Sequence, residues 1–302
     1  MTIRYRRFGE DENEVVAKIF ARAYNDLLTK GGDKPYVDVD DQAGWTKAWR
    51  PDRQALFEHF SASKNESWLA EQDGEVLGYA RSILRDGIWQ LTDFWVLPHK
   101  QAGGIGEVLL DRTFRSRVDS GGRVVVATTG GAAMARYIKC GLDVLSPLLE
   151  FAGPPRSTTI AADVSEEPML DNTPTLEMLS RLDRAILGFD RTVDHKWFLA
   201  KRTGYLYRRR GEPIGYGYVA KWPGPFAARD PADLPVVLAH AETEMAKRDQ
   251  EMTLIVPMVN SDAMRYLLSR GFRMNDKFML LFMADRVRPR LDRYMMWWPG
   301  YC

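Results

Sequence analysis

Cysteine and histidine are scarce in this chain, which has two Cys and four His among its 302 residues. Cys140 and Cys302 do not make a disulfide framework, so a cytoplasmic location is expected. The histidines stand at positions 59, 99, 195 and 240. Their scatter lacks the spacing of a metal site, and no metal is expected.

Long apolar runs and a strong net charge are also missing. No stretch reaches the ~18 apolar residues that a membrane-spanning helix needs, and the N-terminus MTIRYRRFGEDENEV lacks the apolar core of a signal peptide. The net charge of +1 does not favour nucleic acid as the main partner. The length predicts two domains.

The sequence does contain alternating helix and strand patterns, which predict a mixed α+β fold. Asp73-Gly74 is typical of a two-residue hairpin turn, and Gly141 of a residue that ends a helix. In the first half, strands are expected at 3–8, 67–84 (a hairpin), 87–97, 123–129 and 143–151, and helices at 11–28, 52–63, 104–118 and 131–142.

The second half repeats this order, which indicates an internal duplication. Ala133 and Gly141 in the first half have the same spacing as Ala263 and Gly271 in the second. Its hairpin is expected to turn at residues 211–213. We therefore expect two domains with similar central sheets and helices on both faces, at 1–151 and 174–286. Residues 152–173 are expected to form a linker, and the aromatic tail 287–302 to pack back.

A glycine-rich stretch follows the strand that ends at Pro98. A dinucleotide-binding fingerprint needs a glycine three positions after Gly106, where Leu109 stands, and a Walker loop needs Gly-Lys-Ser/Thr, which is absent. A third possibility is a pyrophosphate cradle at a helix N-terminus, where unpaired N–H groups and the helix dipole attract anions. Glycines let phosphate oxygens reach those groups.

The motif Val96-Leu97-Pro98, then Gln101-Ala102-Gly103-Gly104-Ile105-Gly106, resembles the signature of the GCN5-related N-acetyltransferases (GNAT family). A later helix with Ala133, Tyr137, Gly141 and Leu142 resembles the family's second signature, with Leu in place of Phe. The resemblance covers about residues 1–150 well and 174–286 more loosely. It implies an N-acetyltransferase that uses acetyl-CoA as co-substrate.

The resemblance also implies roles for particular residues. The pyrophosphate would bind the loop, and the pantetheine would pair with the edge of the preceding strand. The implied acetyl-CoA contacts are Trp95, Val96, Leu97, Gln101, Ala102, Gly103, Gly104, Ile105 and Gly106. Tyr137 would protonate the departing thiolate, or else is simply packed. Asp93 is the candidate base; His99, a water chain or another residue are alternatives.

The second half departs from both signatures, so it is expected to be a degenerate copy, as in two-domain members of the family. Asp230 and Asp233 replace the glycines, and Leu267 stands where Tyr137 is in the first half. These carboxylates would repel a pyrophosphate. The segment 190–195, with two Asp, an Arg and a His, could contact an acceptor, but ion pairs and capping at a helix junction are the alternative.

The main functional hypothesis is therefore acetyl transfer to a primary amine on a small molecule or peptide, by a monomer or weak homodimer. A non-catalytic acyl-CoA sensor and an enzyme with a longer acyl group or a hydroxyl acceptor are alternatives. The acidic segment 36–45, with Asp38, Asp40 and Asp41, would suit a cationic amine, or is a solvated loop.

Overall fold

The computed structural model describes residues 2–117, 119–248 and 250–297. The chain divides into two compact units. Unit 1 is Met1–Leu84 with Trp89–Arg123, and unit 2 is Arg85–Ile88 with Val124–Cys302. The first 151 residues, expected to form one domain, therefore contribute to both units.

Unit 1 begins with β1 and ends with α4, which a π-helical turn at Asp111–Arg115 extends. Asp73 and Gly74 have φ of 52° and 84°, as a tight hairpin between β2 and β3 requires. Pro51 starts α3, where its missing N–H costs nothing. The elements are β1 Arg4–Arg7, α1 Asn13–Lys30, α2 Gln42–Ala48, α3 Pro51–Ala62, β2 Asn65–Gln72, β3 Glu75–Arg85, β4 Ile88–Val96 and α4 Ile105–Leu110.

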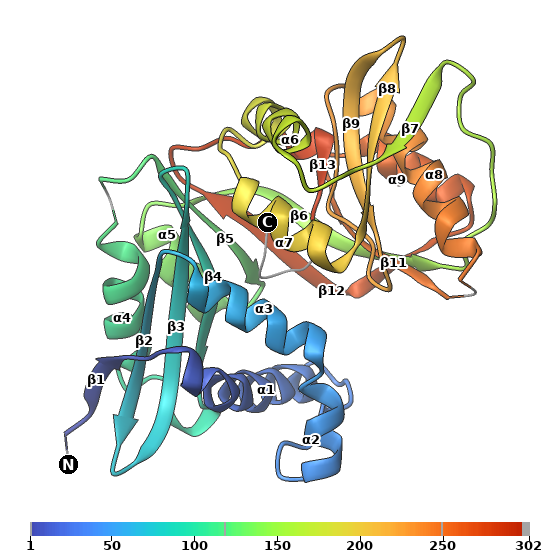
Figure 1. Cartoon of the computed structure of the whole chain (residues 1–302). Coiled ribbons are helices and arrows are strands. Elements are labelled where there is room, and N and C mark those ends of the chain that lie inside the picture. The colour runs from blue at the N-terminus through green and yellow to red at the C-terminus, as the bar shows by residue number, and fades with distance from the viewer. Residues whose placement is uncertain (1, 118, 249, 298–302) are drawn as a thin grey trace. The chain divides into compact units, whose positions relative to one another are not determined.

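The sheet of unit 1 has the strand order β1-β2-β3-β4 and carries helices on both faces (Figure 1). Leu69 and Tyr79 point into one apolar cluster with residues of α1 and α3. Their neighbours Ala70 and Ala80 point into another with Ile105 of α4. This alternation follows from the two-residue period of a strand, and it gives β3 and β4 two different environments.

Unit 2 contains two sheets. Its elements are β5 Gly122–Thr128, α5 Gly131–Lys139, β6 Asp143–Gly153, β7 Val164–Pro168, α6 Thr173–Ile186, α7 Thr192–Lys201, β8 Thr203–Arg209, β9 Glu212–Val219, β10 Phe226–Ala228, α8 Leu234–Ala246, β11 Met252–Pro257, α9 Ser261–Ser269, β12 Arg273–Ala284 and β13 Tyr294–Met295.

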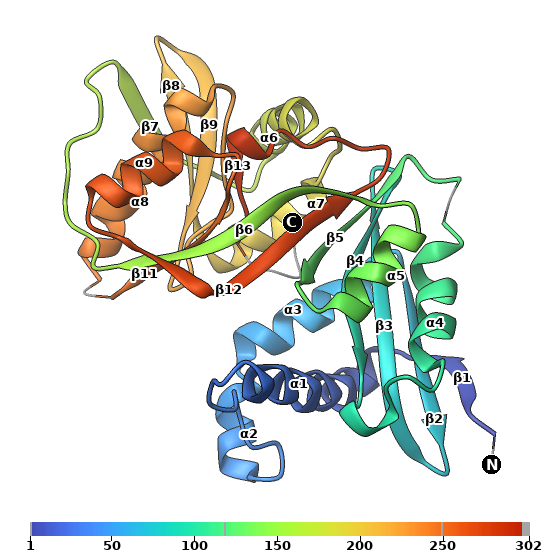
Figure 2. The same ribbon diagram turned by 180° about the vertical axis from the view of Figure 1, so that it is seen from behind.

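The two halves of the sequence exchange strands within unit 2. The order is β5-β12-β6-β11, and Figure 2 shows β6 beside β12. β12, from the second half, lies between β5 and β6 of the first half, with Phe282 opposite both Val126 and Ser146. β6 in turn lies between β12 and β11, with Phe151 opposite Leu254. Each half therefore completes its strand pairing with a strand of the other.

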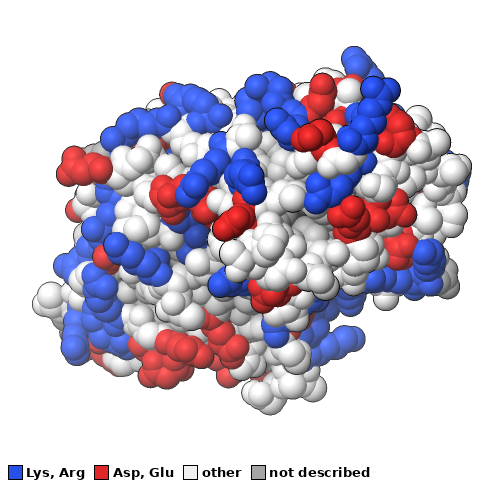
Figure 3. Space-filling view, turned by 45° about the horizontal axis from the view of Figure 1, so that its top comes forward, with Lys and Arg blue, Asp and Glu red and all other residues white. Residues whose placement is uncertain are grey.

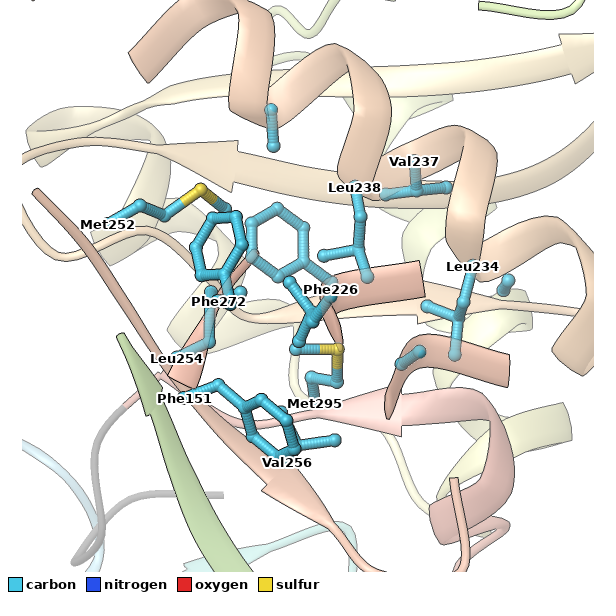
Figure 4. Packing of buried hydrophobic residues seen from close by; sticks show 14 of the residues in the cluster. Phe151, Phe226, Leu234, Val237, Leu238, Met252, Leu254, Val256, Phe272 and Met295 are labelled. Carbon is cyan, nitrogen blue, oxygen red and sulfur yellow. The ribbon is translucent and has the colours of Figure 1, made fainter. Parts of the chain in front are cut away.

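The second sheet of unit 2 has the order β13-β10-β9-β8-β7, and its neighbouring strands pair antiparallel. It shares a large apolar core with α8, α9, β6 and β11 (Figure 4). Phe226, Val237, Met252 and Phe272 are among its fully or almost fully buried side chains. This core joins the second half to β6 of the first half.

The structure differs from the sequence expectation in three places. The expected linker, 152–173, contains β7, whose Glu167 pairs with Leu206 of β8; the strand is mostly exposed and polar, so it lacks an apolar pattern. The hairpin between β8 and β9 turns at Arg210 and Gly211, with φ of 50° and 84°, and not at 211–213. The acidic segment runs into α2, which Asp41 caps.

The tail was expected to pack back, and its described part contains β13. Phe226 of β10 lies opposite Met295, and Tyr294 and Met296 are also buried. Residues 298–302, including Cys302, lie outside the described residues. Figure 3 shows basic and acidic side chains interspersed over the face that it draws.

Strand exchange leads to a first prediction. A chain that ends at residue 173 lacks β11 and β12, the two neighbours of β6. We expect this fragment to show no cooperative urea transition by circular dichroism, because β5 and β6 keep unpaired backbone groups and exposed apolar faces. Co-expression of residues 174–302 should restore the transition. A cooperative transition of the fragment alone would contradict this role of the exchange.

Candidate active site

The glycine loop of unit 1 connects β4 to α4. After Val96, a short 3-10 turn at Pro98–Lys100 leads into Gln101, whose side-chain Nε2 donates to the Val96 carbonyl at 3.2 Å. Ala102 and Gly104 then adopt left-handed φ of 68° and 81°. Gly104 caps α4, and its carbonyl accepts from the N–H of Glu107 at 3.1 Å. The predicted strand, loop and helix are thus present.

The three glycines of the loop are required for different structural reasons. A Cβ on Gly106 would lie 3.1 Å from the ring of Phe94, so this glycine lets α4 pack closely on β4. A Cβ on Gly104 would meet nothing within 4 Å, and one on Gly103 only the Lys100 carbonyl at 3.6 Å. Gly104 needs its left-handed φ, but the space above both residues is open, as the approach of a ligand requires.

The loop also presents backbone donors. The N–H of Gln101 bonds to the Pro98 carbonyl, and that of Glu107 to Gly104. Within the described residues, the backbone hydrogen bonds leave the N–H groups of positions 102–106 unpaired. Residues 101–104 are exposed. Unpaired, accessible N–H groups at the start of a helix can bind an anion such as a phosphate.

The end of β4 presents two different faces. Phe94 and Val96 pack against α4, whereas Trp95 and Leu97 pack with α1. The N–H of Leu97 donates to the Leu77 carbonyl at 2.9 Å. The sequence placed Asp93 and Trp95 on one face and Phe94 and Val96 on the other, and the packing confirms this division.

Asp93 lies at the centre of a buried polar group. Tyr79 donates its hydroxyl hydrogen to Oδ1 at 3.0 Å, and the Thr92 hydroxyl lies 3.1 Å from Oδ2. Burial raises the pKa of Asp93, although the charge of Arg81 and these hydrogen bonds act in the opposite direction. A carboxylate that binds its proton more tightly than usual is suited to accept one at neutral pH.

Sequence reasoning missed Tyr79 and Arg81. Both are fully buried on β3, and Arg81 donates to Asn13 Oδ1 at 2.7 Å. A signal was present in the repeated sequences GEVLGYAR at 74–81 and GEPIGYGY at 211–218. They align Tyr79 with Tyr216, and both tyrosines donate to a buried aspartate.

Tyr137 lies on α5 of unit 2 and is buried, with 5% of its surface exposed. Burial raises the pKa of its hydroxyl, so it keeps its proton at any ordinary pH. The helix ends as predicted: Gly141 has φ of 90°, and the N–H of Leu142 donates to the Tyr137 carbonyl at 3.2 Å.

The second half reproduces this scaffold without the same side chain. Gly271 has φ of 84°, and the N–H of Phe272 donates to the Leu267 carbonyl at 3.0 Å. The hydrogen bond corresponds to that between Leu142 and Tyr137. Leu267 therefore occupies the position of Tyr137, as the alanine and glycine spacing predicts, and it has no proton to donate.

The counterpart of the glycine loop is filled by carboxylates. Asp230 accepts from the N–H of Ala232 at 3.0 Å, and the buried Asp233 forms an ion pair with Arg209. The first donors before α8 thus already have an acceptor. Carboxylates here would repel a phosphate, in agreement with the expectation from the sequence.

The strand that corresponds to β4 lacks the aspartate. A Cβ on Gly78 would lie 2.8 Å from the Trp95 carbonyl, and one on Gly215 would meet the carbonyl of Ala227. Because Gly78 and Gly215 are equivalent, Trp95 is equivalent to Ala227, and two residues earlier Asp93 is equivalent to Pro225. A carboxylate on this strand is therefore a feature of the first half alone.

The polar segment 190–195 has internal partners. Asp190 caps the start of α7 by accepting from Thr192, and Asp194 pairs with Arg85, 2.7 Å away and equally buried. Arg191 and His195 both contact Asp183, each at 2.9 Å. These are the ion pairs and the capping that the sequence offered as the alternative to acceptor contacts.

Asp183 is the charged centre of that network. Burial alone would raise the pKa of its carboxyl, but the charges of Arg191 and His195 and their hydrogen bonds lower it to about 2. Tyr216 donates a further hydrogen bond to Oδ1 at 2.5 Å. The network is fully buried, so it is a structural centre of unit 2 and offers no accessible site.

The remaining candidates add no site. His99 is exposed on the turn after β4. Across residues 2–117, 119–248 and 250–297, no group of three or more His, Cys, Asp or Glu side chains could hold a metal ion. No helix in the described part of the chain is both long and apolar enough to cross a membrane.

Comparison with known proteins identifies the class. Residues 34–142, which include the glycine loop and Tyr137, match the model of the Acetyltransferase (GNAT) family. This segment is an acetyltransferase domain of the GNAT type, and the resemblance based on its two motifs is confirmed. The match supports acyl transfer as the class of reaction. None of the curated protein sequences compared matches the chain.

Solved structures resemble the whole chain. A provisionally assigned acetyltransferase from Pyrococcus horikoshii has a TM-score of 0.72 at 16% identity, covering 99% of this chain and 96% of that one. A GCN5-related N-acetyltransferase from Sphaerobacter thermophilus has a TM-score of 0.61 at 14% sequence identity, covering 94% of this chain and 95% of that one. A tandem GNAT protein from the clavulanic acid biosynthesis pathway has a TM-score of 0.58 at 13% sequence identity, covering 94% of this chain and 98% of that one. These likenesses confirm the α+β fold.

The raised pKa of Asp93 leads to a second prediction, which concerns stability. Because the folded state favours the protonated carboxyl, its contribution is favourable below the unfolded pKa of about 3.9 and is lost as pH rises through the folded pKa. Asp93→Asn removes the ionisation but keeps an acceptor for Tyr79. We expect its unfolding free energy, relative to wild type, to increase between pH 4 and pH 7 in urea titrations.

The exposed Asp171→Asn variant is the matched control for the loss of one carboxylate. If the difference between Asp93→Asn and wild type does not vary with pH, Asp93 is ionised in the folded protein as readily as in the unfolded chain.

Proposed function

We propose that this protein transfers an acetyl group from acetyl-CoA to a primary amine and that its donor site is the glycine loop of unit 1. The observation that carries the proposal is the set of unpaired N–H groups at 102–106 beneath open space at Gly103 and Gly104. The family match at 34–142 supports it.

The loop fits the diphosphate of coenzyme A. Its backbone N–H groups would donate to phosphate oxygens, and the positive end of α4 adds a favourable field. The end of β4, from Trp95 to Leu97, would hold the pantetheine arm by backbone pairing. Acetyl-CoA itself supplies the activated thioester; the residues of the chain position it and exclude competing partners.

The amine attacks the thioester carbonyl carbon, so that a C–N bond forms and the C–S bond breaks. Asp93 is the proposed acceptor of the proton that the ammonium loses, directly or through a water molecule, since its pKa is raised by burial. Tyr137 is the proposed donor of a proton to the departing thiolate, on the basis of its position in the second motif.

The proposed division of labour is asymmetric. The first half supplies the donor loop, Asp93 and Tyr137. The second half, with Asp230, Asp233 and Leu267 at the corresponding positions, is proposed to be a degenerate copy with a structural role. The proposed domain limits are residues 151 and 174. They divide the sequence, but the strand exchange means that they do not divide the sheet, because β12 of the second half pairs with β5 and β6 of the first.

A third prediction tests the donor site. Gly104→Asp places a carboxylate where the phosphates would bind, and we expect calorimetric titration of acetyl-CoA to show one site in wild type and at least about 100-fold weaker binding in the variant, because like charges meet at the helix end.

The matched control is Gly74→Asp. Gly74 has the same left-handed φ of 84° and equally open surroundings, so the variant reproduces the backbone strain away from the loop and should bind acetyl-CoA like wild type. Equal binding by Gly104→Asp and wild type would place the donor elsewhere, and no binding by wild type would refute the proposed function.

A fourth prediction concerns Tyr137. We expect Tyr137→Phe to lower kcat by about 100-fold, a typical contribution of a general acid, while the Kd of acetyl-CoA stays within about threefold. Tyr266→Phe on the corresponding helix α9 is the control and should keep kcat, since Tyr266 hydrogen-bonds Glu242 within the second half. An unchanged kcat in Tyr137→Phe would limit this tyrosine to packing.

A further inference from the structure

The two faces of β4 differ in how much space they leave for an acceptor. The face of Phe94 and Val96 is covered by α4, so closely that a Cβ on Gly106 would touch the Phe94 ring. The opposite face carries Asp93 and Trp95, and the Trp95 side chain is only half-buried. An amine that uses Asp93 as its base must therefore approach from the side of Trp95.

Aromatic rings surround Trp95 on this side. The Phe20 ring meets that of Trp95 edge-on, with 5.0 Å between centroids, and stacks on Tyr24 at 5.4 Å. Tyr36 adds a fourth ring, 6.0 Å from Tyr24. Phe20, Tyr24 and Trp95 are half-buried and Tyr36 is 36% exposed, so the four rings form a partly accessible aromatic group.

The group is held in place by hydrogen bonds to α1. Asn25 Oδ1 accepts from the N–H of Tyr36 at 2.7 Å, and its Nδ2 donates to the Val37 carbonyl at 2.6 Å. The loop that carries Tyr36 is thus fixed to the helix that carries Phe20 and Tyr24. A preorganised aromatic surface loses little conformational entropy when it binds a flat ligand.

The charges near the group are unfavourable for a polycationic acceptor. Arg53 lies over the rings of Tyr36 and Phe20, with Cζ 4.9 and 5.4 Å from their centroids. Its positive charge occupies the ring faces that would otherwise attract an ammonium group and repels further cations.

The carboxylates of the acidic segment already have partners within unit 1. Asp40 pairs with Arg22 at 2.8 Å, Asp41 caps α2, and Asp38 accepts from the N–H of Asp40 at 3.0 Å. The carboxylates that the sequence offered for a cationic amine therefore have structural roles within unit 1.

We infer that the acceptor is a primary amine on a flat aromatic body, recognised by Phe20, Tyr24, Tyr36 and Trp95, with Arg53 disfavouring polyamines. The inference rests on the proposed function and specifies its acceptor. The amine passes its proton to Asp93 directly or through a water molecule, and the aromatic body packs against the accessible parts of the four rings. The four aromatic residues are specificity residues, because they contact the body of the acceptor and not its reacting nitrogen.

The test compares 2-phenylethylamine with spermidine as acceptors. The rate of acetyl transfer is measured as the rate at which the CoA thiol is released. We expect kcat/KM to be at least about tenfold higher for 2-phenylethylamine. Tyr36→Leu should raise the KM for 2-phenylethylamine by about 3- to 10-fold, the usual effect of losing one aromatic contact, and should change kcat little. Tyr36→Phe keeps the ring and should have the wild-type KM. A preference for spermidine, or an unchanged KM in Tyr36→Leu, would overturn the inference.

Tyr5→Leu is the matched control. Tyr5 also has an arginine over its ring, Arg112 at 5.3 Å, but packs in the cluster on the α4 face, so this variant should keep the wild-type KM.

Calorimetric binding of 2-phenylethylamine to the protein saturated with acetyl-CoA separates the two proposals. Binding that Tyr36→Leu weakens, without turnover, would support the inference and refute the proposed function. Turnover of other amines without binding of 2-phenylethylamine would refute the inference alone. If neither 2-phenylethylamine nor any other amine is bound or acetylated, both proposals fail.

Discussion

The antiparallel pairing of β6 with β12 is the constraint on which the rest of unit 2 depends. β6 belongs to the first half of the sequence and β12 to the second, and each lies between two strands. Residues 280–284 of β12 are all buried, as expected for a strand covered on both faces. Each half therefore depends on strands of the other half for part of its backbone hydrogen bonding.

The two halves share local structure but differ at the positions proposed for chemistry. Both copies end a helix with a left-handed glycine and the same backbone hydrogen bond, but Tyr137 corresponds to Leu267. Both place a buried tyrosine on the second strand of a hairpin, yet Tyr79 donates to Asp93 and Tyr216 to Asp183 of α6. In the first copy the aspartate has a raised pKa, and in the second it forms permanent ion pairs. Asp183 is therefore held in ion pairs inside unit 2, whereas Asp93 is not ion-paired by any contact among the described residues.

Much of the local structure could be predicted from the sequence, because periodicity, prolines and glycines act over a few residues. Pro51, Asp73-Gly74 and Gly141 marked real boundaries. The glycine loop was found through its motif. Strand exchange could not be predicted, since an apolar strand fits any neighbour of suitable register. The strand β7 was missed because an exposed edge strand has no apolar pattern, and the contact of Tyr79 with Asp93 depends on side chains that only folding brings together.

The exchange of strands also determines the order in which the protein can fold during its synthesis. Domains usually fold as they leave the ribosome, the N-terminal one first. Here β5 and β6 emerge early, while their common neighbour β12 follows only after the whole of α6 to α9, about ten seconds later at typical rates of elongation. During this interval the edges of β5 and β6 that pair with β12 have no native partner. Nascent chains should therefore depend on chaperones that bind exposed strands until the second copy is complete.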